Sequence, residues 1–197
     1  MILETERLIL RPIVLSDKSD LLEYHGDEDV IRYIPWTVRS SSDVEAAIEA
    51  YQGLSESMIS DGDSIVLGWE LKGNKKLIGQ SNTSLLSLSN KTADIGWVAN
   101  RAYWRQGYAF EATRALLDFL LGATVVQRVI ANIDIRNPES ARLAEKLGMR
   151  LEGHFKQSAY TKGEWCDMWL YAKLAEEHQK GGGPFNKKKP PATISKR

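Results

Sequence analysis

Residues 93–119 read ADIGWVANRAYWRQGYAFEATRALLDF, and the fold depends on how this stretch changes direction. Its first seven residues, 93–99, have the short apolar pattern of a β-strand. A polar loop follows, and Gly107 then opens a segment whose apolar residues recur at helical spacing: Ala109, Ala112, Leu116, Phe119 and Leu120. The stretch is therefore predicted to be a strand, a loop and an amphipathic helix that runs to about residue 121.

Six further segments have the composition and the turn boundaries of β-strands. They are residues 7–13, 64–71, 77–88, 128–135, 149–160 and 165–174. Turn residues at Gly73-Asn74 and Lys162-Gly163 join two pairs of these segments as hairpins. Because adjacent hairpins exclude a simple alternating doubly wound fold, the sequence predicts a mixed α/β layer protein.

Helix signals occupy the segments between these strands. Three helices are predicted before the first hairpin: one from Ser16-Asp17, one over residues 27–34, and one from Ser42-Asp43 to about Ser60. Another is predicted over residues 137–147, where Asn137 suits the N-cap, Pro138 the first helical position and Gly148 the stop. The helices and hairpins together describe one domain without internal repeats.

The composition is that of an ordinary globular domain. The chain has 197 residues, of which 43% are hydrophobic and 26% charged, a mixture that excludes wholesale disorder and fibrous repeats. One cysteine, Cys166, and three histidines are too few for an internal disulfide or a zinc site. No apolar run approaches the ~20 residues of a membrane span, and MILETERLILRP is charged where a signal peptide is apolar. We therefore expect a cytoplasmic protein that binds no metal and no membrane.

Basic residues are concentrated at the C-terminus. The last twenty residues contain six Lys and Arg side chains and no acid, so residues 1–177 carry 20 basic against 26 acidic groups. The same twenty residues hold three prolines and three consecutive glycines, and too few apolar side chains to offset their ordering entropy. We therefore expect a domain over residues 1–177 and a disordered basic extension over 178–197. The acidic body argues against a nucleic-acid-binding domain.

The loop before the Gly107 helix gives the first indication of chemistry. A helix N-terminus presents free N–H groups and the positive end of the helix dipole, which suits a phosphate. Gly107 permits close approach of a ligand to the backbone, and Arg105 adds a positive charge. The segment matches neither GxxxxGK[ST] nor GxGxxG, so the residues alone leave a plain tight turn open.

Three motifs in order extend this interpretation: ETERLILRP at residues 4–12, the opening stretch, and IRNPESARLAEKLGMRLEG at residues 135–153. Together they resemble the GNAT N-acetyltransferases, with the closest similarity to the ribosomal-protein N-terminal acetyltransferases. The likeness runs from about residue 3 to 174. It implies the GNAT fold, a seven-stranded mixed sheet that is flanked by helices and splayed between two parallel strands, here 93–99 and 128–135. It also implies acetyl-CoA as the acetyl donor.

The resemblance assigns a donor site. The family's loop pattern [QR]-x-x-G-x-[GA] is matched at Gly107 and Ala109, whereas Trp104 stands at its first position. The loop backbone is then expected to bind the pyrophosphate. The end of the 93–99 strand is expected to pair with the pantetheine arm and to polarise the thioester carbonyl, although a bulge with a core aromatic remains open. The expected donor-site residues are Trp97, Val98, Ala99, Arg105, Gln106, Gly107, Tyr108, Ala109, Asn137 and Ser140.

The catalytic assignments leave alternatives open. Helix capping alone explains Asn137, but in similar proteins the N-x-x-S pattern reaches CoA, which brings the Ser140 hydroxyl to the departing sulfur. Tyr160 is the second candidate for protonating that sulfur. Ribosomal-type relatives often carry an acid before this tyrosine, where the sequence has Ala159.

The carboxylates that remain inside the motifs are Asp94, Glu111 and Glu152. Glu111 lies three residues from Arg114 on one helix face and is expected to pair with it rather than act as the base. Asp94 or bulk water is then the favoured base, because N-terminal amines have a pKa near 8 and are partly neutral.

Aromatic side chains are candidates for the acceptor site. In similar proteins the segment after the short helix, here Tyr33 and Trp36, contacts the acceptor, and core packing is the alternative interpretation. Tyr160 and Trp165 are expected on the opposite wall. The acceptor is expected to be a primary amine of a peptide N-terminus or of a small molecule, and the chain a monomer or a homodimer.

Two other classes of function remain open from the sequence. A non-catalytic GNAT-like module that binds CoA or a peptide is consistent with Trp104 and Ala159, which depart from the family pattern. A nucleic-acid-associated protein would use Lys187-Lys188-Lys189. The motifs favour an acetyl-CoA-dependent N-acetyltransferase over both.

Overall fold

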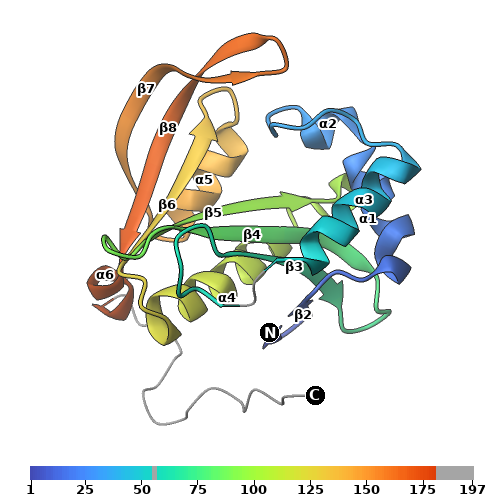
Figure 1. Cartoon of the computed structure of the whole chain (residues 1–197), viewed down its shortest axis with the longest axis horizontal. Helices are drawn as coiled ribbons and strands as arrows, with labels where there is room; N and C mark the ends of the chain where they lie inside the picture. The colour runs from blue at the N-terminus through green and yellow to red at the C-terminus, as the bar shows by residue number, and fades with distance from the viewer. Residues whose placement is uncertain (55–56, 181–197) are drawn as a thin grey trace.

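The computed structural model describes residues 1–54 and 57–180, and one eight-stranded sheet forms the centre of this part of the chain (Figure 1). The strands are β1 (Leu3–Glu4), β2 (Leu8–Arg11), β3 (Ser64–Leu71), β4 (Leu77–Ser87), β5 (Thr92–Ala99), β6 (Arg128–Asp134), β7 (Arg150–Thr161) and β8 (Glu164–Leu174). Their order across the sheet is β1-β2-β3-β4-β5-β6-β8-β7. Neighbouring strands are antiparallel, except that β5 and β6 are parallel. The mixed α/β fold predicted from the sequence is confirmed.

Helices cover both faces of the sheet (Figure 1). They are α1 (Lys18–His25), α2 (Glu28–Ile31), α3 (Ser41–Gln52), α4 (Tyr108–Ala123), α5 (Pro138–Lys146) and α6 (Ala175–Lys180), with short 3₁₀ turns η1 (Leu15–Asp17) and η2 (Arg101–Tyr103). On one face, Leu21 of α1 and Ile48 of α3 share a buried cluster with Val98. On the other face, Leu116 of α4 is buried in a larger cluster with Ile95. Because side chains alternate between the two faces of a strand, β5 contributes Ile95 to one core and Val98 to the other.

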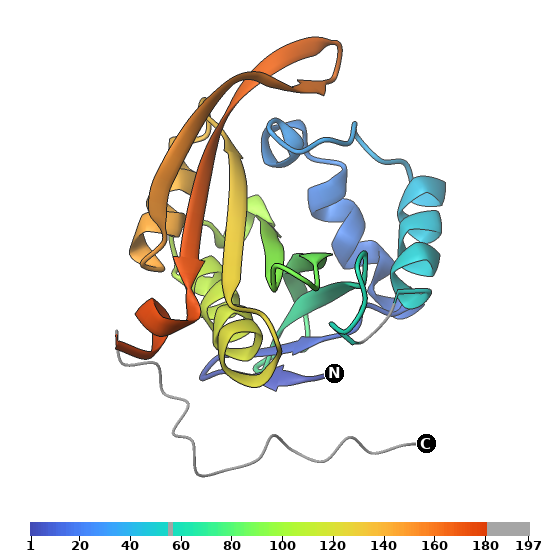
Figure 2. The same ribbon diagram turned by 60° about the vertical axis from the view of Figure 1, so that its left-hand side comes forward.

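Strands β5 and β6 separate after a short parallel ladder. The register joins Thr92 to Arg128 and Asp94 to Ile130, and within the described residues this ladder extends no further. Beyond it, β5 continues beside β4, whereas β6 continues beside β8. Figure 2 shows the two strands diverging, with the β7–β8 hairpin on one side of the opening and α1 to α3 on the other. The predicted splay is confirmed.

The sheet has one strand more than the seven expected. The additional strand, β1, is two residues long, and its Leu3 and Glu4 pair with β2. The Oγ1 atom of Thr5 closes the intervening turn by accepting a hydrogen bond from the backbone N–H of Leu8 (2.9 Å). A two-residue strand has no periodicity, so no pattern in the sequence indicated it.

Helix α3 is shorter than predicted. Ser40 is its N-cap and accepts a hydrogen bond from the N–H of Asp43, in a capping box. Gly53 follows the last helical residue, so the prediction that the helix continues to about Ser60 is wrong. Met58 is only 4% exposed although it lies outside the helix. In the sequence, Met58 continues the helical spacing of Val44, Ile48 and Tyr51, but in the structure it is a buried loop residue.

Helical structure continues beyond the predicted domain boundary at residue 177. Helix α6 ends at Lys180, and His178 within it is 6% exposed. The Nε2 atom of His178 lies 2.7 Å from Oδ1 of Asp118, which belongs to α4. Residues 178–180 therefore pack on the domain, and the rest of the predicted extension, 181–197, lies outside the described residues.

Candidate active site

Two adjoining cavities lie where β5 and β6 diverge. The inner cavity, about 590 Å³, extends from Asp94 toward Trp36 on the side of α1 and α3. The outer cavity, about 700 Å³, extends from Trp97 toward Gly107 at the start of α4. The residues that line both cavities are Arg32, Tyr33, Ile34, Trp97, Val98, Arg136, Asn137 and Ser140. A two-part ligand can therefore lie across the splay, with one part in each cavity.

The outer cavity ends at the N-terminus of α4. Gly107 has φ +86°, which favours glycine, and a Cβ placed there would meet only Nη2 of Arg7, at 3.3 Å. The N-cap glycine supplies no side-chain acceptor, so the first N–H groups of the helix are left for a ligand. Gly107, Tyr108 and Ala109 line the cavity, as does Arg105. This end of the cavity suits a phosphate group.

Gln106 and Trp104 contribute differently from the pattern expected for the loop. The side chain of Gln106 donates to the carbonyl of Ala102 (3.0 Å), and Gln106 is not part of the cavity lining. Trp104, at the position where the family pattern has Gln or Arg, donates from Nε1 to the carbonyl of Ala99 (2.8 Å). The Trp104 side chain therefore ties the loop to the end of β5.

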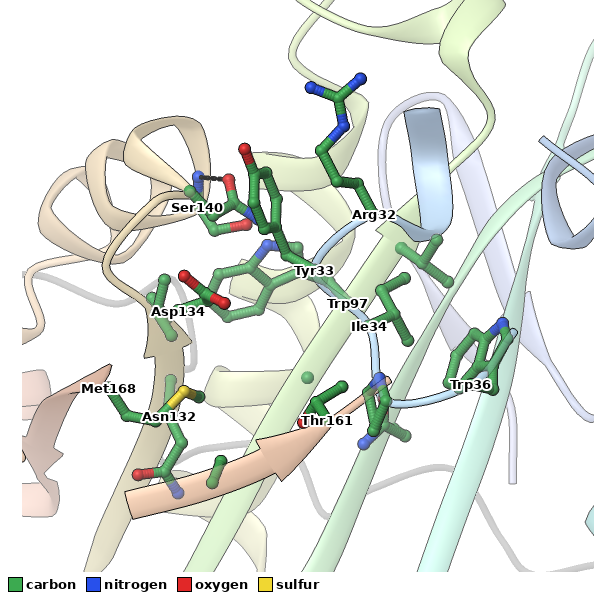
Figure 3. A pocket seen from close by; sticks show the side chains of 18 of the residues that line it. Arg32, Tyr33, Ile34, Trp36, Trp97, Asn132, Asp134, Ser140, Thr161 and Met168 are labelled. Atoms are coloured by element: carbon green, nitrogen blue, oxygen red, sulfur yellow. Dashed lines mark hydrogen bonds between the residues drawn. The ribbon is translucent and has the colours of Figure 1, made fainter. Parts of the chain in front are cut away.

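The N-terminus of α5 lies at the junction of the two cavities, and Figure 3 shows Ser140 at this end of the helix. Asn137 is the N-cap, and its Oδ1 accepts a hydrogen bond from the backbone N–H of Ser140 (3.1 Å). Among the described residues, no group hydrogen-bonds the Ser140 hydroxyl, although Ser140 lines both cavities. The hydroxyl is thus available to a ligand.

Asp94 lines the inner cavity from the end of the parallel ladder. Its Oδ1 accepts a hydrogen bond from the backbone N–H of Ser84 (2.7 Å). Burial raises the pKa of the Asp94 carboxyl, and the hydrogen bond from Ser84 only partly opposes this. A carboxyl group with a raised pKa is suited to exchange a proton nearer to neutral pH.

A second carboxylate on this wall is held by a guanidinium. Arg136 donates to both carboxylate oxygens of Asp134, at 2.9 and 2.6 Å, and to Glu164 at 2.7 Å. Burial favours the neutral form of Asp134, but the hydrogen bonds and charge of Arg136 outweigh it and lower the pKa. Asp134 therefore remains ionised and paired, which makes it a poor base. No local pattern indicated this cluster, since Asp134 and Arg136 at the end of β6 meet Glu164 of β8 only through the pairing of the two strands.

The expected aromatic residues divide into two groups. Tyr33 and Trp36 both line the inner cavity (Figure 3). Trp36 packs against His25, with ring centroids 5.4 Å apart, and its Nε1 is buried without a hydrogen-bond partner among the described residues. Both residues are therefore placed where an acceptor can contact them.

Tyr160 and Trp165 lie on the opposite surface of the β7–β8 hairpin. They are 63% and 61% exposed, and their rings pack edge to face at 5.2 Å. Their neighbours Ala159 and Thr161 line the inner cavity instead, because side chains alternate between the faces of a strand. The structure thus places Tyr160 and Trp165 outside the lining of both cavities, apart from the other expected site residues.

The turn of this hairpin contacts α2. The Nζ atom of Lys162 donates to the carbonyl of Ile31 (2.6 Å), at the end of the short helix. Burial lowers the pKa of Lys162. Figure 2 shows the hairpin and α2 facing one another across the opening of the sheet. The inner cavity is therefore bounded by a contact between segments 131 residues apart.

A splayed mixed sheet with a helix N-terminus at the opening that no side chain caps is the arrangement expected of an acetyl-CoA-dependent acetyltransferase. Residues 7–150 match the acetyltransferase (GNAT) domain family, and the chain belongs to this family. The chain is accordingly an acetyl-CoA-dependent N-acetyltransferase.

Individual relatives support this assignment. The chain is 32% identical to the uncharacterized N-acetyltransferase YnaD of Bacillus subtilis, over 90% of this chain and 99% of the relative. It is 26% identical to the ribosomal protein uS5-alanine N-acetyltransferase of Escherichia coli, over 86% and 89% of the two chains. The crystal structure of a GNAT-family acetyltransferase from Bacillus anthracis is 32% identical, with a TM-score of 0.80, and the match covers 90% of this chain and all of that one. The resemblance to ribosomal-protein acetyltransferases is thereby confirmed.

Two further expectations concern absences. Within the described residues, no helix is both long and apolar enough to cross a membrane. In the same part of the chain, His, Cys, Asp and Glu side chains form no group of three that would hold a metal ion.

Proposed function

We propose that the chain transfers the acetyl group of acetyl-CoA to a primary amine by direct attack while both substrates are bound. The observation that supports this proposal is the Ser140 hydroxyl, which has no hydrogen-bond partner in the described chain and lies where the two cavities meet. One cavity then holds the donor and the other the amine. The amine belongs to a peptide N-terminus or to a small molecule.

The outer cavity is the proposed donor site. The backbone N–H groups of Gly107, Tyr108 and Ala109 bind the pyrophosphate at the start of α4, and Arg105 adds charge nearby. The edge of β5 from Trp97 to Ala99 has no β6 partner in the described register, so its backbone groups are free to pair with the pantetheine arm. An N–H of this edge polarises the thioester carbonyl.

The inner cavity is the proposed acceptor site, with Tyr33 and Trp36 as its aromatic wall. Asp94 accepts the proton that the amine must lose, directly or through a water molecule, and its raised pKa fits that role. Ser140 donates a hydrogen bond to the sulfur as negative charge develops on it, and Asn137 positions Ser140 by capping α5. These roles complete the three requirements of the reaction: a neutral amine, a polarised carbonyl and a stabilised leaving group.

The alternative that the sequence left open, a non-catalytic module that binds CoA or a peptide, is not favoured by membership of an enzyme family. Such a module would bind acetyl-CoA but release no free thiol when amines are added. The alternative gained support in the sequence from Trp104. In the structure that side chain bonds to Ala99 and leaves the α4 N-terminus open.

Initial-rate kinetics test the order of events. If both substrates are bound together, reciprocal plots at several amine concentrations intersect, and the mass of the protein after incubation with acetyl-CoA alone is unchanged. Parallel lines together with an acetylated protein would indicate a covalent intermediate and would contradict direct attack.

A further inference from the structure

One end of the inner cavity presents hydrogen-bond donors that lack acceptors. Arg39 lines this end, and its Nη1 donates to Nδ1 of His25 and to the hydroxyl of Tyr51, both at 3.1 Å. A guanidinium has five N–H donors, and the Nε and Nη2 groups of Arg39 make no hydrogen bond to any described residue. The ring of Trp36 stacks against the guanidinium, with 4.6 Å from Cζ to the ring centroid. The guanidinium is therefore held in place, and its Nε and Nη2 groups remain available to donate to a ligand.

The groups around Arg39 are committed to one pattern of hydrogen bonds. Burial lowers the pKa of His25 to about 4, so its ring is neutral at pH 7. Nε2 of His25 donates to Oε1 of Gln80 (2.9 Å), which leaves Nδ1 to accept from Arg39. The Tyr51 oxygen accepts from Arg39 and from Nε2 of Gln80 (3.4 Å). With two bonds accepted, the Tyr51 hydroxyl keeps its own hydrogen to donate.

The charge of Arg39 is not balanced by a carboxylate, in contrast to the other two arginines of this cavity. Arg136 pairs with Asp134 and Glu164, and Arg32 pairs with Asp29. Lys162 has no carboxylate partner among the described residues either, but its Nζ donates to the carbonyls of Ile31 and Arg32. No described carboxylate lies within ion-pair distance of Arg39. Asp43 is nearby, and Ser40 and more weakly Arg39 lower its pKa, but its carboxylate is bound by Ser40. A cation and a phenol donor without acceptors match an oxygen-rich anion.

We propose that Arg39 and Tyr51 bind a carboxylate or phosphate group of the acetyl acceptor, so that the preferred substrates are amines carrying an anionic group. This inference rests on the proposed acetyl transfer. Gln80, beside these donors, is the cross-strand neighbour of Val98, which lies within the β5 edge that is proposed to hold the thioester. Neighbouring strands of a sheet lie about 5 Å apart. The amine and the anion are therefore joined by a short linker.

Matched pairs of amines test the proposal. The probes are ω-amino acids from β-alanine to 6-aminohexanoate with their carboxamides, O-phosphoethanolamine with ethanolamine, and tetrapeptides with Glu or Gln as the second residue. In the unmodified protein, kcat/KM for at least one anionic probe is expected to exceed that of its neutral partner by about 10- to 100-fold. The probe with the largest ratio identifies the source of the anion.

Two variants assign the preference to these residues. Arg39→Gln removes the charge and is expected to bring the ratio close to one. Tyr51→Phe removes one donor, keeps the ring and should lower the ratio about threefold to tenfold. Arg32→Gln is the matched control, since Arg32 lines the same cavity but is paired with Asp29, and it should leave the ratio unchanged. If Arg39→Gln does not fold, Tyr51→Phe decides.

Equal kcat/KM for charged and neutral probes would overturn the proposal, as would a preference that survives both variants. A binding measurement separates this result from failure of the proposed function. Butyrate and phenyl phosphate carry the anion without an amine, and they should bind the unmodified protein and not Arg39→Gln in calorimetry. Anion binding without turnover of any probe would uphold the anion site and reject acetyl transfer. Turnover of charged and neutral probes at equal kcat/KM would uphold acetyl transfer and reject the anion site.

Discussion

Nε of Arg7 donates a hydrogen bond to Oε2 of Glu111 at 2.6 Å, between residues 104 positions apart in the chain. The same guanidinium donates from Nη1 to the carbonyl of Gln106 (3.1 Å) and lies 4.2 Å from the ring centroid of Tyr108. Glu111 in turn accepts a hydrogen bond from the hydroxyl of Thr5 (2.6 Å). The N-terminal segment therefore holds both sides of the loop that opens α4. The proposed pyrophosphate site is thus fixed before any ligand binds.

The first prediction concerns this loop. Gly107→Glu brings a side chain and a negative charge to the helix N-terminus and is expected to weaken acetyl-CoA binding at least 100-fold, as measured by calorimetry. The positive φ of Gly107 adds a stability loss of about 1 kcal/mol. Gly122→Glu is the matched control, because Gly122 is exposed near the other end of α4 with no atom near its Cβ position. If folded Gly107→Glu binds acetyl-CoA with the same affinity as the unmodified protein, the loop does not form the donor site.

The second prediction concerns the leaving group. Ser140→Ala removes the hydroxyl but keeps the backbone N–H that Asn137 accepts from, so stability should change by less than about 1 kcal/mol. Turnover should fall roughly 10- to 100-fold, as expected for one hydrogen bond to a group that becomes charged. Acetyl-CoA affinity should hardly change, because the bond strengthens only in the transition state. Full turnover, or a loss of stability equal to the loss of activity, would contradict this role.

The third prediction concerns the base. Asp94→Asn retains an acceptor for the Ser84 N–H but cannot take a proton, so turnover at neutral pH should fall roughly 100-fold. In the unmodified protein, kcat/KM should rise with pH as Asp94 loses its proton, and its raised pKa places this rise above the range of an ordinary aspartate. The variant should lack this rise. A pH profile that keeps the same rise in Asp94→Asn would assign it to another group or to the amine.

Stability gives an independent readout of the same carboxyl. Burial raises the pKa of Asp94 in the folded chain, so its contribution to stability is present below the ordinary aspartate pKa and is lost as pH rises through the folded value. Asp94→Asn is neutral at every pH. It should therefore be more stable than the unmodified protein at pH 7, with the advantage disappearing below roughly pH 4. Chemical denaturation at a series of pH values measures this difference.

The fourth prediction concerns the domain boundary. A chain ending at residue 177 lacks His178, whose Nε2 lies 2.7 Å from Asp118, and should melt several degrees lower than a chain ending at residue 180. Loss of a buried hydrogen-bonded partner costs about 1–3 kcal/mol. His178→Ala in the full chain should reproduce the decrease. Equal melting temperatures for the two truncated chains would show that residues 178–180 do not stabilise the domain and that the domain ends at residue 177.

The strands and the donor loop could be predicted because their signals are local. Gly107, Asn137 and Pro138 each report the conformation of their own segment, and the structure places all three at helix N-termini. The outward orientation of Tyr160 depended on the register of an irregular hairpin, which shifts between Phe155 and Ala159. No local pattern determines such a shift.

The acceptor side could not be predicted for a related reason. Arg39, Tyr51 and Gln80 come from a loop, a helix and a strand, and each residue is unremarkable in its own segment. Only the packing of α1 and α3 on the sheet brings their polar atoms together. Likewise, Glu111 was expected to pair with Arg114 on one helix face. It pairs with Arg7 instead, and Arg114 bonds to Asp118.

The most direct test of the central claim follows both products of the reaction at once. The protein is incubated with acetyl-CoA and each of the matched charged and neutral amines described above. Released CoA is measured with a colorimetric thiol reagent, and the acetylated amine is measured by mass spectrometry. The account predicts, for at least one amine, thiol and acetylated amine in equal amounts, with both lost in Gly107→Glu and retained in Gly122→Glu. Tight acetyl-CoA binding with no thiol release for any amine, or thiol release without an acetylated product, would contradict it.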